Sequence, residues 1–291
     1  MTRPSTLIGI GYMLLAMAIL PGIDVIAKHM GQAGTPVLQL VWARLTFGAL
    51  LTLPFAARAT TRRGLIPDRP FLHGLRASLL MLATFLFFYS LKYLPIADAL
   101  AIFFVQPLVV TALSPLVLGE RVGPRRWGAV AVGFLGTLII IRPGLAEVNP
   151  GVAFALGAGT SLALYFLLTR RIAGQAPAIV TTFHTNLLGG LIASALVPLV
   201  WQWPNATDWL MLLSLAAIAN LGHYFIVRAY DHAEASLLAP LAYTEMVTST
   251  LMGWVFFGDF PDGFTFLGVA ILIASAIYIS AREAAVRRSA A

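Results

Sequence analysis

An acidic side chain stands in the middle of a long apolar run. The stretch LLAPLAYTEMVTSTLMGWVFFG, residues 237–258, is apolar enough to cross a bilayer, yet it contains Glu245 near its centre. A charged group at the centre of a membrane helix costs about 2.5 kcal/mol or more to insert. Such groups usually face a bundle interior or a watery cavity. We therefore predict that Glu245 lines a cavity, where it binds a substrate amine or carries a proton. The alternative is a protonated or paired carboxyl that clamps two helices.

Gln106 occupies the matching place in an earlier apolar run. Residues 89–120 align with residues 228–259, and each segment begins with a polar turn and ends on glycine followed by an acid, at Gly119 and Gly258. In this alignment Gln106 and Glu245 fall at equivalent positions. Two polar groups at one depth, one in each repeat, predict a cavity on the axis that relates the repeats.

Three further charged residues lie in or near the first two apolar runs. Arg44 needs a carboxylate or water as partner, and Asp24 and Glu245 are both candidates, between which the sequence does not choose. Arg44 is also a candidate ligand for a substrate carboxylate, because a guanidinium binds carboxylates bidentately. Asp24 and Lys28 lie four residues apart on one helical face, which predicts a structural ion pair or, alternatively, a gate.

Amide, imidazole and aromatic side chains complete the candidate site. Asn220 and His223 share a helical face, and His223 either relays protons near neutral pH or forms a structural hydrogen bond. No carboxylate stands at ligand spacing from a histidine, so we predict no metal site and no cofactor. The aromatic residues proposed to line the cavity, which could instead pack helices, are Trp42, Tyr89, Phe103, Tyr224 and Tyr243.

The composition places these residues in lipid. Of 291 residues, 59% are hydrophobic and 11% are charged, whereas a soluble domain carries about 25% charged residues. The mean hydropathy is +0.86. The net charge of +7 is spread along the chain, without a basic stripe or a nucleotide-binding motif. We therefore expect no nucleic-acid partner and no use of ATP.

Apolar runs recur along the whole chain and predict an all-α integral membrane protein with ten transmembrane helices. The expected spans cover residues 7–28, 36–57, 71–92, 95–118, 127–141, 151–169, 178–200, 209–228, 236–257 and 264–280. The first run continues past the length of a usual signal-peptide core, so we expect a retained helix.

The breaks between the spans lie alternately on the two sides of the membrane. Most arginine residues, with Arg76 among them, are assigned to one side, whereas Lys28, Lys92 and Arg142 are assigned to the other. By the positive-inside rule both termini are expected in the cytoplasm, in a bacterial-type inner membrane.

The repeat divides the chain at its middle. Residues 1–145 would form one five-helix repeat and residues 146–291 the second. Because five is odd, the two repeats would cross the membrane in opposite directions, as two inverted five-helix repeats. Small residues spaced by four in the fifth and tenth spans favour close helix packing, or less directly a weak homodimer contact in place of a monomer.

These features resemble the EamA-type exporters of the drug/metabolite transporter superfamily over nearly the whole chain. The resemblance rests on the five-plus-five layout, Gly119–Glu120 after the fourth span, RPG at residues 142–144, and an acid or amide in the fourth and ninth spans. Family members often carry Glu-Pro in the ninth span, whereas Met246 follows Glu245 here.

The resemblance implies a secondary transporter that exports small amphipathic metabolites by alternating access, with amino acids as the expected class and aromatic amino-acid exporters as the most similar subfamily. Lipophilic drugs or cations are the alternative cargo. An intramembrane lipid-modifying enzyme is the rival class, but the sequence lacks cysteine and the HExxH and GxSxG motifs, so we expect no enzyme.

Overall fold

Helices account for the regular structure of every segment described by the computed structural model, namely residues 4–61, 65–119, 123–142, 149–171, 176–233 and 238–290. No strand occurs in these segments. The helices are α1 (Pro4–Ile19), α2 (Pro21–Gln32), α3 (Val37–Ala59), α4 (Pro70–Ser90), α5 (Ile96–Phe103), α6 (Gln106–Leu118), α7 (Pro124–Ile141), α8 (Pro150–Arg171), α9 (Ala178–Leu196), α10 (Ala206–His232), α12 (Thr244–Phe257) and α13 (Gly263–Ala290), with the 3₁₀ helices η2 (Val197–Leu199) and η3 (Ala239–Tyr243).

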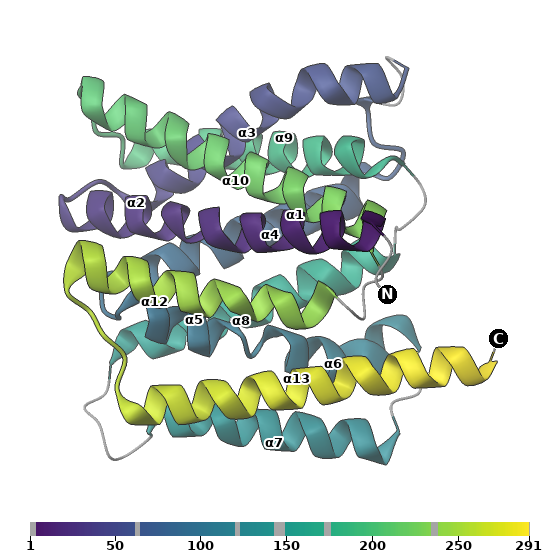
Figure 1. Ribbon diagram of the computed structural model, residues 1–291. Helices are drawn as coiled ribbons and strands as arrows, with labels where there is room; N and C mark the ends of the chain where they lie inside the picture. The colour runs from purple at the N-terminus through teal and green to yellow at the C-terminus, as the bar shows by residue number, and fades with distance from the viewer. Residues whose placement is uncertain are drawn as a thin grey trace.

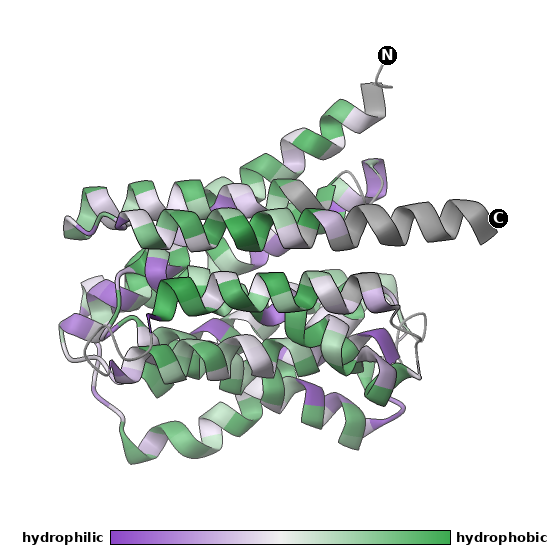
Figure 2. Cartoon of the chain, turned by 90° about the horizontal axis from the view of Figure 1, so that it is seen from below, coloured by the Kyte–Doolittle hydropathy of each residue, from purple (hydrophilic) through white to green (hydrophobic). Residues whose placement is uncertain are grey.

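Length and hydropathy identify the helices that suit a membrane. Within the described residues, seven stretches are long and apolar enough to span a bilayer: Thr6–Gln32, Val37–Ala59, Pro70–Ser90, Ile96–Leu118, Pro150–Arg171, Ala178–Leu199 and Ala206–His232. Two shorter apolar helices are Trp127–Ile141 and Gly263–Ser275. Figure 2 shows hydrophobic residues along the helices and hydrophilic residues mainly at helix ends and loops. The chain is therefore an all-helical integral membrane protein.

Three of the expected spans are interrupted, which corrects the prediction of continuous helices there. The first breaks between α1 and α2 at Pro21, and the fourth between α5 and α6 just before Pro107. In the ninth, Pro240 lies in the 3₁₀ helix η3, and the α-helix α12 starts only at Thr244. Proline lacks the N–H that a helix interior needs, so each break falls beside a proline. The ninth span is thus broken without the Glu-Pro pair of the family.

The helices run side by side, and four pairs make the most extensive contacts: α3 with α9, α4 with α8, α7 with α13, and α1 with α10. Figure 1 shows α13 lying along α7 at one side of the bundle, and both chain ends at the same end of the bundle. The α7–α13 pair is closely packed. A Cβ placed on Gly136 would lie 2.9 Å from the Gly268 carbonyl oxygen, and one on Gly268 would lie 2.6 Å from the Gly136 carbonyl oxygen. The expected close packing of these two spans is therefore present, and the closest approach lies at Gly136 and Gly268.

Candidate functional site

A polar pocket lies between five of the helices. The space among its side chains, open solvent included, is about 420 Å³. The lining comes from α3, α4, α8, α9 and α10, and consists of Arg44, Leu45, Leu80, Tyr165, Thr182, Thr185, Asn186, Ala219, Asn220 and His223. Three of these, Arg44, Asn220 and His223, are among the residues that the sequence proposed. Such a concentration of polar groups between apolar helices is typical of a site that binds a solute.

Arg44 lies on the α3 side of this pocket. Its Nη1 donates a hydrogen bond of 2.7 Å to Thr84 Oγ1 of α4. The charge of Arg44 also acts on Asp24 of α2, which is buried. Of the two acidic partners that the sequence offered, Asp24 is therefore the one that interacts with Arg44, and it does so at longer range than a hydrogen bond.

Two amides and an imidazole form the α9 and α10 side. Asn186 Nδ2 lies 3.5 Å from Asn220 Oδ1, and Asn220 Nδ2 donates to the Ala216 carbonyl oxygen at 2.8 Å. Gly48 of α3 makes room for them, because a Cβ there would lie 2.9 Å from Asn186 Nδ2 and 3.2 Å from Asn220 Nδ2. His223 is next to them along α10, exposed toward the pocket rather than covered by protein.

Arg76 is a functional candidate that the sequence analysis missed. It was counted with the basic residues of the loops, but it is only 1% exposed and lies within α4. Its Nη2 donates to the Thr181 carbonyl oxygen at 2.6 Å and to Thr185 Oγ1, and its guanidinium lies 5.3 Å from the centre of the Tyr165 ring. The signal that could have found it is its position almost two turns into an apolar helix.

Glu245 and Gln106 each lie just after a helix break. Gln106 is the first residue of α6, and Glu245 lies in the first turn of α12. Both are partly buried, and neither belongs to the lining of the pocket described above. Glu245 acts electrostatically on Asp24, so two carboxyl groups lie near each other between α2 and α12. The two breaks also meet directly, because the Phe104 and Tyr243 rings are 5.1 Å apart.

The two faces of α12 differ in burial. Ser249, one turn after Glu245, is fully buried. Leu251, Val255 and Phe256 are exposed and suit contact with lipid.

The structure places the other proposed aromatic residues outside the pocket lining. Trp42 Nε1 donates to Ser194 Oγ at 2.9 Å, and its ring packs edge-on against Trp201. Phe103 packs on Phe87 with ring centres 4.8 Å apart. These two contacts are packing contacts between helices.

Tyr89 and Tyr224 differ in their surroundings. Tyr89 packs edge-on against Phe154 of α8 with ring centres 4.7 Å apart. Tyr224 is 54% exposed, so the face predicted for Asn220 and His223 does not extend to it.

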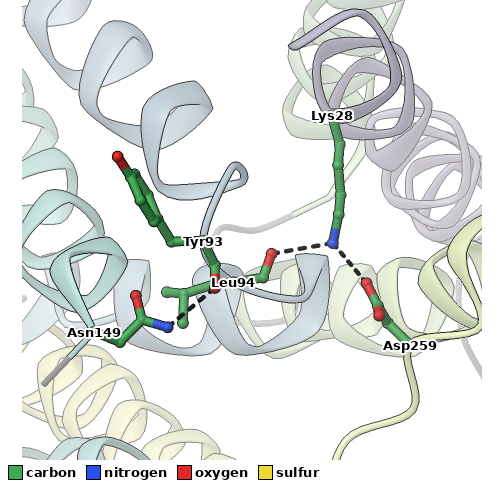
Figure 3. A network of polar contacts seen from close by, with 5 residues as sticks. All are labelled: Lys28, Tyr93, Leu94, Asn149 and Asp259. Atoms are coloured by element: carbon green, nitrogen blue, oxygen red, sulfur yellow. Dashed lines mark hydrogen bonds and ion pairs between the residues drawn. The ribbon is translucent and has the colours of Figure 1, made fainter. Parts of the chain in front are cut away.

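Lys28 has a different partner from the one predicted. It pairs with Asp259 rather than with Asp24, at 2.6 Å between Nζ and Oδ2, and it also donates to the Leu94 carbonyl oxygen at 3.1 Å. Figure 3 shows Lys28 between these two acceptors, which lie on separate loops, and beside them Asn149 donating to the Tyr93 carbonyl oxygen. The predicted Asp24–Lys28 pair is wrong because helix spacing does not exclude a closer acceptor on another loop. This polar tie links α2 to the α4–α5 and α12–α13 connections.

The fold and the pocket together define a helical membrane protein with a polar pocket between its helices. The sequence pattern of the EamA-like transporter family matches residues 7–142 and again residues 149–281, so the chain belongs to this family.

Three relatives cover most of the chain. The S-adenosylmethionine uptake transporter of Rickettsia conorii is 26% identical over 94% of this chain and 92% of its own length. The riboflavin transporter of Vibrio cholerae is 29% identical over 92% and 90%, respectively. The pseudopaline exporter of Pseudomonas aeruginosa is 26% identical over 85% and 87%. Family and relatives indicate a transporter of small molecules rather than an enzyme, and none of these three names supports aromatic amino-acid export.

One solved crystal structure has the same fold. It matches with a TM-score of 0.63 over 94% of this chain and 95% of its own, at 24% sequence identity.

Proposed function

We propose that the protein is a secondary transporter that carries a small amphipathic organic solute across the cytoplasmic membrane by alternating access. The observation that carries this proposal is the polar pocket among apolar helices, lined by Arg44, Asn186, Asn220 and His223. Polar and charged side chains are unfavourable inside a bilayer, so a cluster of them between membrane helices supports a role in binding or transport.

The moving parts are two inverted five-helix halves, residues 1–145 and 146–291. The double match of the family pattern supports this division. So do the helix contacts. In this division α1–α2 corresponds to α8, α3 to α9, α4 to α10, α5–α6 to η3–α12, and α7 to α13. Exchanging the halves then leaves the α3–α9 and α7–α13 contact pairs unchanged. The same exchange turns the α4–α8 pair into the α1–α10 pair. In transporters of this architecture broken helices flank the site, and here the breaks before Gln106 and Glu245 correspond.

Asp24 and Glu245 are the proposed coupling or cation site. Two nearby carboxylates repel each other, and the repulsion is relieved by a bound proton or by a cationic group of the solute. Asp24 also interacts with Arg44 of the pocket. Binding of the solute and occupancy of the acidic pair would thus be linked through one side chain.

For the substrate and the direction of transport we propose candidate classes. Amino acids, including aromatic ones, stay candidates for export. The named relatives add uptake of S-adenosylmethionine and transport of riboflavin. Lipophilic drugs or cations are a second candidate class. We further propose that both termini are cytoplasmic and that the unit is a monomer or weak homodimer.

Flux measurements on the purified protein in proteoliposomes test this function. We expect movement of at least one labelled solute from a panel of amino acids, S-adenosylmethionine and riboflavin, measured with and without a pH gradient. Glu245→Gln is expected to lower the flux and to change its pH dependence, whereas Asp231→Asn, on the exposed end of α10, is the matched control. Turnover of a lipid without flux of any solute would contradict transport. An unchanged pH profile in Glu245→Gln would exclude the proposed coupling role.

A further inference from the structure

Two arginine residues bracket the pocket along one side of α4. Leu80 of α4 lines the pocket, Arg76 lies one turn before it, and Thr84, which accepts the Arg44 hydrogen bond, lies one turn after it. Eight residues of α-helix rise about 12 Å, so the backbone positions of Arg76 and Thr84 are separated by about this distance along α4, with Leu80 between them. The Tyr165 side chain interacts electrostatically with both arginines.

Arg76 carries its charge into the bundle with neutral partners. Its hydrogen bonds go to the Thr181 carbonyl oxygen, Thr185 Oγ1 and Thr169 Oγ1, and its Nε is buried without a hydrogen bond. In the part of the chain that the structure describes, no acidic side chain pairs with it. A buried charge without a counter-charge is unfavourable by several kcal/mol in general, so a permanent structural role leaves the charge uncompensated.

Among the residues that the structure describes, Thr84 accepts one hydrogen bond from Arg44, and the other guanidinium donors are left for the pocket. Nη1 is bonded to Thr84, while its one acidic neighbour, Asp24, is shared with Glu245. The remaining lining contributes hydroxyl, amide and imidazole groups and no carboxylate. Arg44 is the arginine of this lining, and Asp24 lies outside the lining, so the residues that line the pocket carry a positive charge, with Arg76 behind Thr185.

We propose that this pocket binds the carboxylate of the transported solute. Arg44 is its direct ligand, through the donors that Thr84 leaves free, and Arg76 is a positioning charge that holds Thr185 and Tyr165 and adds attraction for the anion. The inference rests on the proposed transport function and specifies its substrate class. A guanidinium presents paired donors that match a carboxylate, which is why arginine rather than lysine suits this place.

Matched probes that differ only in the anionic group test the inference. Binding of S-adenosylmethionine and of its decarboxylated form, and of phenylacetate and phenylacetamide, is measured by calorimetry on the full-length protein in detergent. We expect the carboxylate-bearing member of a pair to bind roughly tenfold to a hundredfold more tightly. Equal affinities, or no binding by either carboxylate-bearing probe, overturn the proposal. Flavin mononucleotide and riboflavin are compared in the same way. A preference for flavin mononucleotide alone, with no preference in the two carboxylate pairs, would assign the pocket to phosphate and would also overturn the proposal.

Variants then assign the effect to the two arginines. Arg44→Gln is expected to abolish the preference for the carboxylate-bearing member of each pair. Arg58→Gln, the same change at the exposed end of α3, is expected to keep it. Arg76→Lys is expected to retain most of the preference and Arg76→Gln to reduce it, which separates the charge from the packing. A full preference in Arg44→Gln overturns the proposal.

Flux in proteoliposomes distinguishes this inference from the function itself. Transport of solutes without regard to a carboxylate would leave the transporter standing and remove the arginine site. Carboxylate binding without any flux would support the arginine site and contradict the transport function.

Discussion

At the scale of single residues, the site depends on polar side chains that satisfy one another while keeping donors free. Thr84 Oγ1 accepts a hydrogen bond from Arg44 Nη1, and the Ala216 carbonyl oxygen accepts one from Asn220 Nδ2. Each contact fixes a side chain whose entropy would otherwise weaken binding. Gly48 has a comparable role, since it provides the space in which the two amides lie.

Substitution Gly48→Ala tests this use of space. The added methyl group would lie 2.9 Å from Asn186 Nδ2, so the amide must move, and we expect weaker binding of the solute with little change in folding. The measurement is the apparent KM for flux together with the thermal unfolding midpoint. The control is Gly74→Ala in α4, where an added Cβ meets nothing within 4 Å. Unchanged KM in Gly48→Ala would contradict the placement of the amides in the site.

At the scale of elements, helix ends and breaks determine how the parts meet. Arg142 ends α7 in a left-handed conformation with φ of 50°, and its side chain pairs with Asp262, which precedes α13. Asp262 Oδ1 also accepts the Thr265 backbone N–H at 2.9 Å, an N-cap contact. The end of one helix thus fixes the start of its close-packed neighbour.

The Asp262 cap makes a pH-dependent contribution to stability. The hydrogen bond from the Thr265 backbone N–H, with help from Arg142, holds the pKa of the Asp262 carboxyl below its ordinary value. A lowered folded-state pKa gives stability above the unfolded-state pKa, near 4, which is lost as the pH falls toward the folded-state value.

We expect Asp262→Ala to lose about 1 kcal/mol of stability at neutral pH and Asp262→Asn, which can still cap, to lose less. Unfolding midpoints between neutral pH and pH of about 3 measure this. A difference between wild type and Asp262→Ala that stays constant as the pH falls would contradict it.

The contacts of Lys28 join α2 to two loops at one end of the bundle. Because Lys28 joins α2 to two loops, its removal should let this end open more often. In a Lys28→Met background we expect faster labelling of a cysteine placed at Ala97, which is buried one turn beyond Leu94. The chain has no cysteine of its own, so the label reports one position.

Lys92→Met, an exposed lysine at the same end, is the matched control for this experiment. Equal labelling rates in the two variants would show that the tie does not hold the end closed.

At the scale of the whole molecule, the proposed inverted repeat has a geometric consequence. Thr35 and Ala176 precede the corresponding prolines, Pro36 and Pro177, that open α3 and α9. Inverted halves place them on opposite sides of the membrane, whereas parallel halves would place them on the same side.

We expect Thr35→Cys to react with an impermeant maleimide in intact cells and Ala176→Cys to react only after the membrane is opened. The cysteine-free parent protein is the control. Reaction of both positions from one side would exclude the inverted arrangement, and the reverse assignment would place both termini outside.

The membrane class and most helix positions followed from the sequence, because long apolar runs have no stable alternative to helices in lipid. The equivalence of Gln106 and Glu245 also came from the sequence, and both lie just after helix breaks. The breaks themselves were missed, since hydropathy does not distinguish a continuous helix from two collinear pieces beside a proline.

Only the tertiary structure decided which charges meet. Lys28 pairs with Asp259, 231 residues away, rather than with its helical neighbour Asp24, and Arg76 lies inside the bundle instead of in a loop. The partner of a buried charge is set by which helices pack together, and that packing depends on small residues and distant contacts that carry no signal in a local pattern. The sequence therefore determined that polar groups must be sheltered from lipid, and the packing of α3, α4, α8, α9 and α10 determined which of them share a pocket.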